Sequence, residues 1–262
     1  MLTQRLAVAA VGLPLLGVLL WSPERAFSAT IALVIAIGAF EVARAALPNA
    51  PLSAHASAAV AAAFVVALTR TQDWFEVGTL VPAVALALFM VLRPGAEPKP
   101  MPASWWLVAV AYPGVLGAHF VLLRLLPEGQ TWLVVLLAST FATDTGAYAV
   151  GRLFGKHKLA PSISPGKTRE GAVGGFVAGA LAVVAATFLL DAPPEALAIG
   201  VIAVTLPVLG QAGDLLESAL KRRLDVKDMS RLLPGHGGIM DRLDSLLATG
   251  PALYWLVRWL SQ

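Results

Sequence analysis

The sequence predicts an all-α, polytopic integral membrane protein with about nine transmembrane helices. Hydrophobic residues make up 58% of the 262 positions and charged residues only 13%, against roughly 45–50% and 25% in soluble domains. A transmembrane helix needs about 20 mostly apolar residues to cross roughly 30 Å of hydrocarbon. Nine segments meet this requirement: 5–21, 28–47, 52–69, 75–92, 104–124, 131–150, 171–190, 196–216 and 243–260.

The N-terminal region, residues 1–130, is predicted to consist of transmembrane helices. Its first segment follows Arg5 and has small residues near Ser28 and Ala29, so a cleaved signal peptide is the alternative interpretation. Because eight further apolar segments follow, we interpret it as a helix that stays in the bilayer.

The C-terminal region, residues 131–262, is predicted to be the catalytic part, because it contains the two longest polar stretches, the loops 151–170 and 217–242. In its second span, Gly171, Gly175 and Gly179 recur at every fourth position. This spacing lets two helix backbones approach closely, which indicates packing.

The positions of Lys and Arg predict the orientation. If nine helices alternate across the membrane, 15 of the 19 Lys and Arg residues lie on the side that holds both polar loops, and four lie on the other. The basic side of a membrane protein is cytoplasmic. Both loops are therefore expected to face the cytoplasm. The absence of cysteine excludes disulfides and thiolate metal sites.

Carboxylates occur in pairs at the ends of two predicted spans. Asp214 and Glu217 end the eighth span, and Asp241 and Asp244 begin the ninth. Residues three apart share a helix face, and carboxylate oxygens are preferred ligands of hard divalent cations, which also hold substrate phosphates. These pairs predict a metal-bridged phosphate site.

Cationic side chains lie between these carboxylates, followed by a turn at 234–238 that includes His236. The cations are Lys221, Arg222, Arg223, Lys227, Arg231 and Arg242. Arg and Lys beside carboxylates favour a polyanion such as a nucleotide triphosphate. The alternative is a basic anchor on anionic headgroups. His236 could ligate a metal or act as an acid or base, but among glycines a hydrogen bond to phosphate or a role in the turn is favoured.

A second polar stretch begins at Asp144, within an otherwise apolar span. An intramembrane carboxylate marks a functional site by default, and a carboxylate paired with a neighbouring Arg is the structural alternative. Downstream, the segment Ser164, Pro165, Gly166, Lys167 and Thr168 could present hydroxyls, amides and an ammonium to an anion. It lacks the spacing of a Walker A motif.

These residues resemble the phosphatidate cytidylyltransferases, or CDP-diglyceride synthetases. Within 27 residues, the chain matches the C-terminal signature of that family at Ser218, Lys221, Arg222, Lys227, Asp228, Ser230, His236, Gly237, Gly238, Asp241, Arg242 and Asp244. An upstream stretch is also similar, at Asp144, Ala147, Tyr148, Gly151, Arg152, Gly155, Lys156, Ser164, Pro165, Lys167, Thr168, Glu170 and Gly171.

The resemblance implies that CTP and phosphatidic acid react to CDP-diacylglycerol and pyrophosphate in an all-helical, dimeric membrane enzyme that needs a divalent cation. We expect Mg²⁺, at two divalent sites or one divalent and one monovalent site, and no nucleic-acid partner. The expected location is a bacterial inner membrane, with the active site facing the cytoplasm.

Residue roles follow as a hypothesis. We assign the metals to Asp214 and Asp241, with Asp144 and Asp244 as further ligands. Catalysis is assigned to Asp214, Asp241, Lys167 and Lys227. Substrate binding is assigned to Ser164, Pro165, Lys167, Thr168, Lys221, Arg222, His236 and Arg242.

This function has three alternatives. A polyprenol kinase or another lipid-phosphate transferase would share the chemistry, and a substrate panel separates them. A transporter would use Asp144 and kinked helices for an ion or solute path, yet it does not explain why carboxylates and cations gather in the polar loops. A purely structural scaffold explains them less well still.

Overall fold

The structure is a computed structural model that describes residues 2–70, 102–190 and 196–260, together with positions 81, 84, 85, 88 and 92. The chain forms two compact units. Unit 1 comprises Met1–Leu122 and Leu220–Leu243, and unit 2 comprises Leu123–Ala219 and Asp244–Gln262. Three of the described helices, α6, α9 and α10, contribute residues to both units, and each unit is described by itself below.

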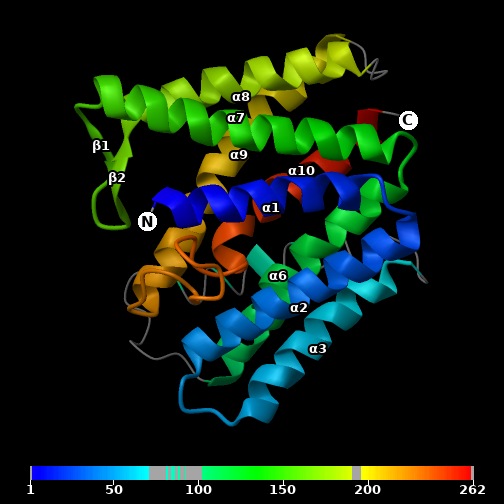
Figure 1. The fold of residues 1–262 in the computed structure, drawn as a ribbon, viewed down its shortest axis with the longest axis vertical. Coiled ribbons are helices and arrows are strands. Elements are labelled where there is room, and N and C mark those ends of the chain that lie inside the picture. Colours follow the sequence, from blue (N-terminus) through cyan, green and yellow to red (C-terminus); the bar gives the residue numbers. More distant parts are fainter. Residues whose placement is uncertain are drawn as a thin grey trace. The chain divides into compact units, whose positions relative to one another are not determined.

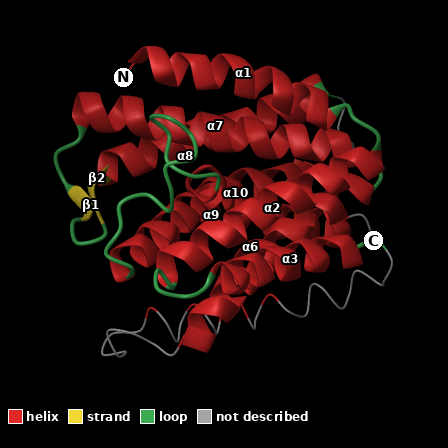
Figure 2. Ribbon diagram, turned by 60° about the horizontal axis from the view of Figure 1, so that its bottom comes forward, coloured by secondary structure: helices red, strands yellow, loops and turns green. Residues whose placement is uncertain are grey.

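The described elements are almost all helices (Figures 1 and 2). In chain order they are α1 (Leu2–Leu20), α2 (Glu24–Ala46), α3 (Leu52–Leu68), α6 (Pro102–Leu125), α7 (Gly129–Phe154), β1 (Lys158–Ala160), β2 (Ser164–Thr168), α8 (Arg169–Leu189), α9 (Ala196–Arg223) and α10 (Met240–Leu260). The prediction of an all-α membrane protein is confirmed.

The predicted count of nine spans is not supported. Among the described residues, five helices are long and apolar enough to cross a membrane: Glu24–Ala46, Pro102–Leu125, Gly129–Phe154, Arg169–Leu189 and Leu197–Arg223. The first and third predicted spans correspond to shorter apolar stretches, Ala10–Leu20 and Leu52–Leu68. The ninth, α10, carries Asp241, Arg242 and Asp244 near its start. The fourth, 75–92, lies mostly outside the described residues.

The two predicted polar loops are shorter than expected. Within 151–170, α7 continues to Phe154, and an antiparallel hairpin of β1 and β2 follows, with Lys158 opposite Thr168. Within 217–242, α9 continues to Arg223, so the loop covers 224–239 only. Lys221, Arg222 and Arg223 form the last turn of α9, where cations interact favourably with the helix dipole.

The helices of unit 1 pack through small residues. Ala58, Ala62 and Val66 of α3 are fully buried, at spacings that place them on one face of the helix. A Cβ added at Gly114 of α6 would lie 3.2 Å from the Ala62 Cα. At Gly117, an added Cβ would overlap the side chain of Ile35 of α2. Close helix approach therefore holds this unit together.

In unit 2, the glycine stripe of α8 packs against α7, and the two helices lie side by side in Figure 1. Gly171, Gly175 and Gly179 are buried. A Cβ added at Gly175 would lie 2.7 Å from the Thr143 carbonyl oxygen and 2.9 Å from the Ala147 Cβ. The prediction that these glycines serve packing is confirmed.

Replacing Gly175 should therefore destabilise unit 2. We expect Gly175→Ala to lower the free energy of unfolding by about 1–3 kcal/mol, because the backbones of α7 and α8 must move apart. Gly200 of α9 is the matched control, since nothing lies within 4 Å of a Cβ added there, and alanine favours a helix interior over glycine. Thermal unfolding in detergent measures both variants. Equal melting temperatures would contradict the close packing.

Candidate functional site

The hairpin of unit 2 is fixed to the first turn of α8. The Thr168 hydroxyl caps this helix by accepting a hydrogen bond of 3.1 Å from the Gly171 amide. Glu170 accepts bonds of 3.1 and 3.2 Å from the amides of Lys156 and His157, and its other oxygen lies 2.6 Å from the His157 Nδ1. The strand that carries Lys167 is thereby held at a fixed helix end.

A cavity of about 420 Å³ lies between this hairpin and three helices, and we call it the hairpin pocket. Its lining comes from α7, the hairpin, α8 and α9. The lining residues are Asp144, Ala147, Tyr148, Gly151, Arg152, Leu159, Gly166, Lys167, Thr168, Gly171, Ala172, Gln211 and Asp214. Every one of them belongs to unit 2.

Opposite charges meet in the hairpin pocket. The Lys167 ammonium lies 2.5 Å from the Asp214 Oδ2, and both side chains are about a quarter exposed. Asp144, Tyr148 and Arg152 follow at intervals of four residues and therefore share one face of α7. The Arg152 guanidinium donates a 2.7 Å hydrogen bond to the Tyr148 hydroxyl. The pocket thus offers two carboxylates and two cations to one ligand.

Asp244 lies beside the same part of unit 2. A Cβ added at Gly213 of α9 would lie 2.7 Å from the Asp244 carbonyl oxygen, so α10 touches α9 one residue before Asp214. The Asp244 Oδ1 accepts a 2.6 Å bond from the Ser245 amide. Unit 2 therefore contains three of the four predicted metal ligands: Asp144, Asp214 and Asp244.

Asp241, the fourth predicted ligand, belongs to unit 1 and organises the loop 224–239. It is 3% exposed. Its Oδ1 accepts a 2.8 Å bond from the Lys221 ammonium, and its Oδ2 accepts bonds of 2.9 and 2.8 Å from the amides of Met229 and Gly238. Such charge-assisted bonds are stronger than neutral ones. The loop is thus tied to α9 and α10 through one carboxylate.

The predicted turn at 234–238 is confirmed. The His236 amide donates to the Leu233 carbonyl at 2.9 Å, and Gly235 has φ 76°. With Pro234 before it, this is a type II turn, which needs glycine at its third position. Gly237 has φ 81°, and a Cβ there would lie 2.8 Å from the Asp241 Oδ2. Glycine is therefore required at both positions.

Glu41 of α2 was not singled out from the sequence. It is 4% exposed and accepts three hydrogen bonds: 2.6 Å from the Ser230 hydroxyl, 3.1 Å from the Ile239 amide and 2.9 Å from the Met240 amide. A Cβ added at Gly238 would lie 2.5 Å from its Oε2. A carboxylate in an apolar span is the signal that would have found it, as it found Asp144.

The predicted site residues therefore fall into two groups. Lys167, Thr168, Asp144 and Asp214 line the hairpin pocket, with Thr168 acting as a helix cap. Ser164 and Pro165 are on β2 but do not line it. Lys221, Asp241, Arg222, Lys227, His236 and Arg242 belong to unit 1. In the part of the chain that is described, no three His, Asp or Glu residues form a group suited to a metal ion.

Comparisons with known proteins agree with the sequence resemblance. A family model described as the cytidylyltransferase family matches residues 3–260. A phosphatidate cytidylyltransferase of Mycobacterium bovis is 38% identical over 95% of this chain and 85% of its own length. A protein of the same name from Bacillus subtilis is 43% identical over 57% of this chain and 56% of its own length. Another, from Staphylococcus haemolyticus, is 41% identical over 58% of this chain and 58% of its own length.

Removing the Glu41 carboxylate should loosen the loop 224–239. We expect Glu41→Ala to reduce the free energy of unfolding by about 2–4 kcal/mol, because buried donors lose their acceptor. Limited proteolysis should then cut within 224–239 faster than in the unmodified protein. Glu24→Ala is the control on the same helix, where the side chain is exposed. If Glu41→Ala lowered the free energy of unfolding no more than Glu24→Ala does, the anchoring role would be contradicted.

Proposed function

The chain belongs to the cytidylyltransferase family and is a nucleotidyltransferase, and we propose that it transfers the cytidylyl group of CTP to phosphatidic acid. The products are CDP-diacylglycerol and pyrophosphate. The names of the relatives support this lipid acceptor. The observation in the structure that supports it most is the hairpin pocket, where a lysine and two carboxylates suit a metal-bound triphosphate.

The proposed reaction is an in-line displacement. An oxygen of the lipid phosphate attacks the α-phosphorus of CTP and forms the new P–O bond. The bond from the α-phosphorus to the bridging oxygen breaks, and pyrophosphate leaves with the electron pair. Catalysis of such displacements consists mostly of positioning and charge stabilisation, so no covalent enzyme intermediate is required.

Residues of the hairpin pocket would bind the nucleotide phosphates. Lys167 and Arg152 supply the positive charge. The Lys167 ammonium contacts Asp214. Because an ammonium has three N–H donors, it would be able to contact a phosphate at the same time. Gly166 lies in the wall, and nothing lies within 4 Å of a Cβ added there, so a phosphate would have access to the backbone. Ala147, Leu159 and Ala172 form an apolar part of that wall.

The two carboxylates of the hairpin pocket supply oxygen ligands of the kind that a divalent cation prefers. The Asp214 Oδ2 already contacts one positive group, the Lys167 ammonium. Asp144 lines the same cavity. We assign Mg²⁺ to Asp214 and Asp144 of the hairpin pocket, with Asp244 of the same unit as a further candidate. Asp241 of unit 1 is assigned as a ligand through Oδ1, the oxygen that Lys221 contacts. A second ion, divalent or monovalent, is proposed as well. When bound, the metal neutralises charge on the attacking and leaving oxygens.

The remaining roles concern unit 1. Lys227, Arg222 and Arg242 are exposed cations that would neutralise phosphates, with Lys227 assigned to catalysis. His236 would donate a hydrogen bond to a phosphate from its fixed turn. We further propose a homodimer in a bacterial inner membrane. The active site is proposed to lie on the cytoplasmic side, because 11 of the 19 Lys and Arg residues are in 151–170 and 217–242, two stretches separated by the candidate spans α8 and α9.

Label transfer tests the proposed reaction. Purified protein in detergent is given α-labelled CTP and phosphatidic acid, with and without Mg²⁺, and the lipid extract is analysed. We expect label in CDP-diacylglycerol only when both the lipid and the metal are present. Folded protein that labels no lipid would contradict the proposal, and label transferred to a polyprenol instead would assign the chain a different acceptor.

The carboxylate of Asp214 should be essential for turnover. We expect Asp214→Asn to reduce kcat by at least about 10²-fold, a loss typical of removing one group that stabilises transition-state charge. Asp225→Asn is the matched control, because Asp225 is exposed and lines neither pocket, and asparagine tolerates its φ of 55°. Initial rates of label transfer compare the two. A normal rate from Asp214→Asn would exclude the assignment.

The orientation can be tested with single cysteines, because the natural chain has none. Ser162→Cys, at the exposed tip of the hairpin, should react with a membrane-impermeant maleimide in inside-out vesicles and not in intact spheroplasts. Ser22→Cys, between α1 and α2, should show the reverse. Labelling of Ser162→Cys in spheroplasts would overturn the cytoplasmic assignment.

A further inference from the structure

A second cavity, of about 500 Å³, lies within unit 1, and we call it the α2 pocket. One wall is the C-terminal part of α2, from which Ile37, Phe40, Glu41, Arg44 and Ala45 line the cavity. These spacings place all five side chains on one face of the helix. The other wall is the loop 224–239, which contributes Val226, Met229, Ser230, Arg231 and Leu232. None of these residues lines the hairpin pocket.

The α2 pocket lies where a membrane helix meets the lipid headgroups. Helix α2 has 23 residues and qualifies as a membrane span. At 1.5 Å per residue it is about 35 Å long, slightly more than the roughly 30 Å hydrocarbon layer. Arg44 is in its last turn, so this end of the helix extends to the headgroup level. The preceding turn, with Ile37 and Phe40, then lies at the depth of acyl chains.

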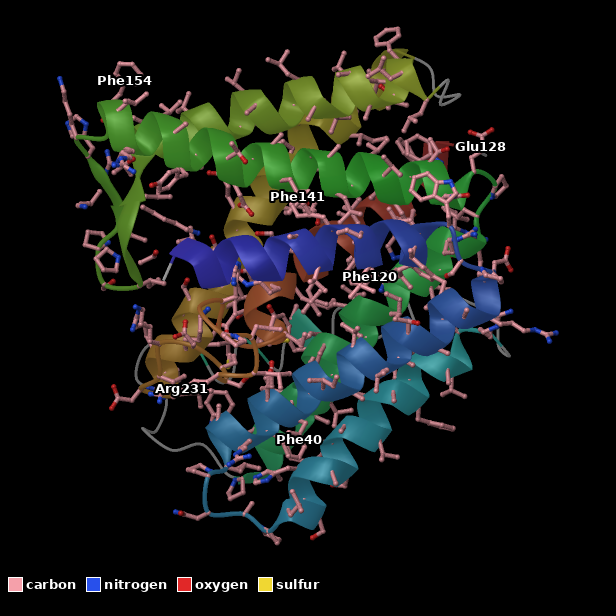
Figure 3. The ribbon with its side chains drawn as sticks, in the orientation of Figure 1. Phe40, Phe120, Glu128, Phe141, Phe154 and Arg231 are labelled. Atoms are coloured by element: carbon pink, nitrogen blue, oxygen red, sulfur yellow. The ribbon has the colours of Figure 1, made fainter. Side chains whose placement is uncertain are left out.

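The charges around the α2 pocket favour an anion. Arg44 and Arg231 are both exposed, and Figure 3 labels Arg231 on the loop and Phe40 on α2. Among the lining residues that the structure describes, Glu41 is the one acidic residue. Its charge is already met by the Ser230 hydroxyl and two backbone amides. Two guanidinium groups therefore remain for a ligand, each able to bind phosphate oxygens through two parallel hydrogen bonds.

We propose that the α2 pocket binds the phosphate headgroup of phosphatidic acid, with the first acyl carbons along Ile37, Phe40 and Leu232. This inference rests on the proposed function, because it names the lipid subsite of that reaction. A lipid fits better than a free nucleotide. Most of the described lining is apolar, namely Ile37, Phe40, Ala45, Val226, Met229 and Leu232, and this end of α2 lies at the boundary between headgroups and acyl chains.

Glu41 gives the α2 pocket its shape. It holds Ser230, the residue before Arg231, at 2.6 Å, and the Ser230 hydroxyl in turn accepts a 3.1 Å bond from the Leu232 amide. The backbone on both sides of Arg231 is therefore fixed to α2 through Glu41, three residues from Arg44. The two guanidinium groups are thus attached to one rigid frame, which lowers the entropy lost on binding.

The test uses the full-length protein in an uncharged detergent, with Arg44→Gln, Arg231→Gln and the double variant. Arg25→Gln is the matched control, because Arg25 is exposed at the opposite end of α2. The KM for phosphatidic acid, varied as its mole fraction in the micelles, is measured at saturating CTP, and the KM for CTP at saturating lipid. Retention of labelled phosphatidic acid by immobilised protein without CTP measures binding apart from turnover.

We expect each single variant to raise the KM for phosphatidic acid about tenfold, as loss of one charge-assisted contact would. The double variant should raise it further and retain little lipid, while the KM for CTP and the control stay within about twofold. Unchanged lipid KM and retention in the double variant would overturn the inference. A rise in the KM for CTP alone would overturn it too, by assigning the pocket to the nucleotide.

The same experiment separates this inference from the proposed reaction. If the unmodified protein transfers no label but retains phosphatidic acid, and the double variant does not retain it, the α2 pocket is a lipid site and the reaction is wrong. If label transfer proceeds and the arginines change neither lipid KM nor retention, the reaction stands and the subsite is wrong.

Discussion

The structure of unit 1 depends on how two buried carboxylates are neutralised. Glu41 and Asp241 are 4% and 3% exposed, and each accepts three hydrogen bonds. Five of these six bonds come from the loop 224–239 or from Met240, the first residue of α10, and the sixth comes from Lys221. A buried carboxylate without such donors is costly. These contacts are therefore obligatory, and they give a glycine-rich loop one conformation. Gly237 and Gly238 are required because the two carboxylates lie where their side chains would be.

A fixed loop would suit the phosphate binding that we propose for this enzyme. Phosphate binding needs cations held in place, and long Lys and Arg side chains on a mobile loop lose entropy when they bind. Here Lys221 is held by Asp241, Arg231 follows a serine bound to Glu41, and His236 lies in a type II turn. In unit 2, the hairpin gives Lys167 the same support through Glu170 and Thr168.

Much of this could be predicted from the sequence, for identifiable reasons. Apolar length and the spacing of Gly171, Gly175 and Gly179 are local properties, so the helical fold and the close packing of α8 followed from them. Asp144 was found as a carboxylate in an apolar span, Asp214 as one of a carboxylate pair at a span end, and Lys167 within a polar segment, and the three share a pocket. The hairpin was missed because its strands are three and five residues long. Glu41, also a carboxylate in an apolar span, was passed over, and its partners could not be inferred because they lie about 190 positions away.

Hydrogen exchange in detergent, followed by mass spectrometry with overlapping peptides, tests most directly whether two carboxylates fix the loop. The account predicts slow exchange for the amides of Met229, Gly238, Ile239 and Met240, which donate to Asp241 or Glu41, at rates close to those of the α10 interior. Uniformly fast exchange across 224–239, as in an unstructured polar loop, would contradict it.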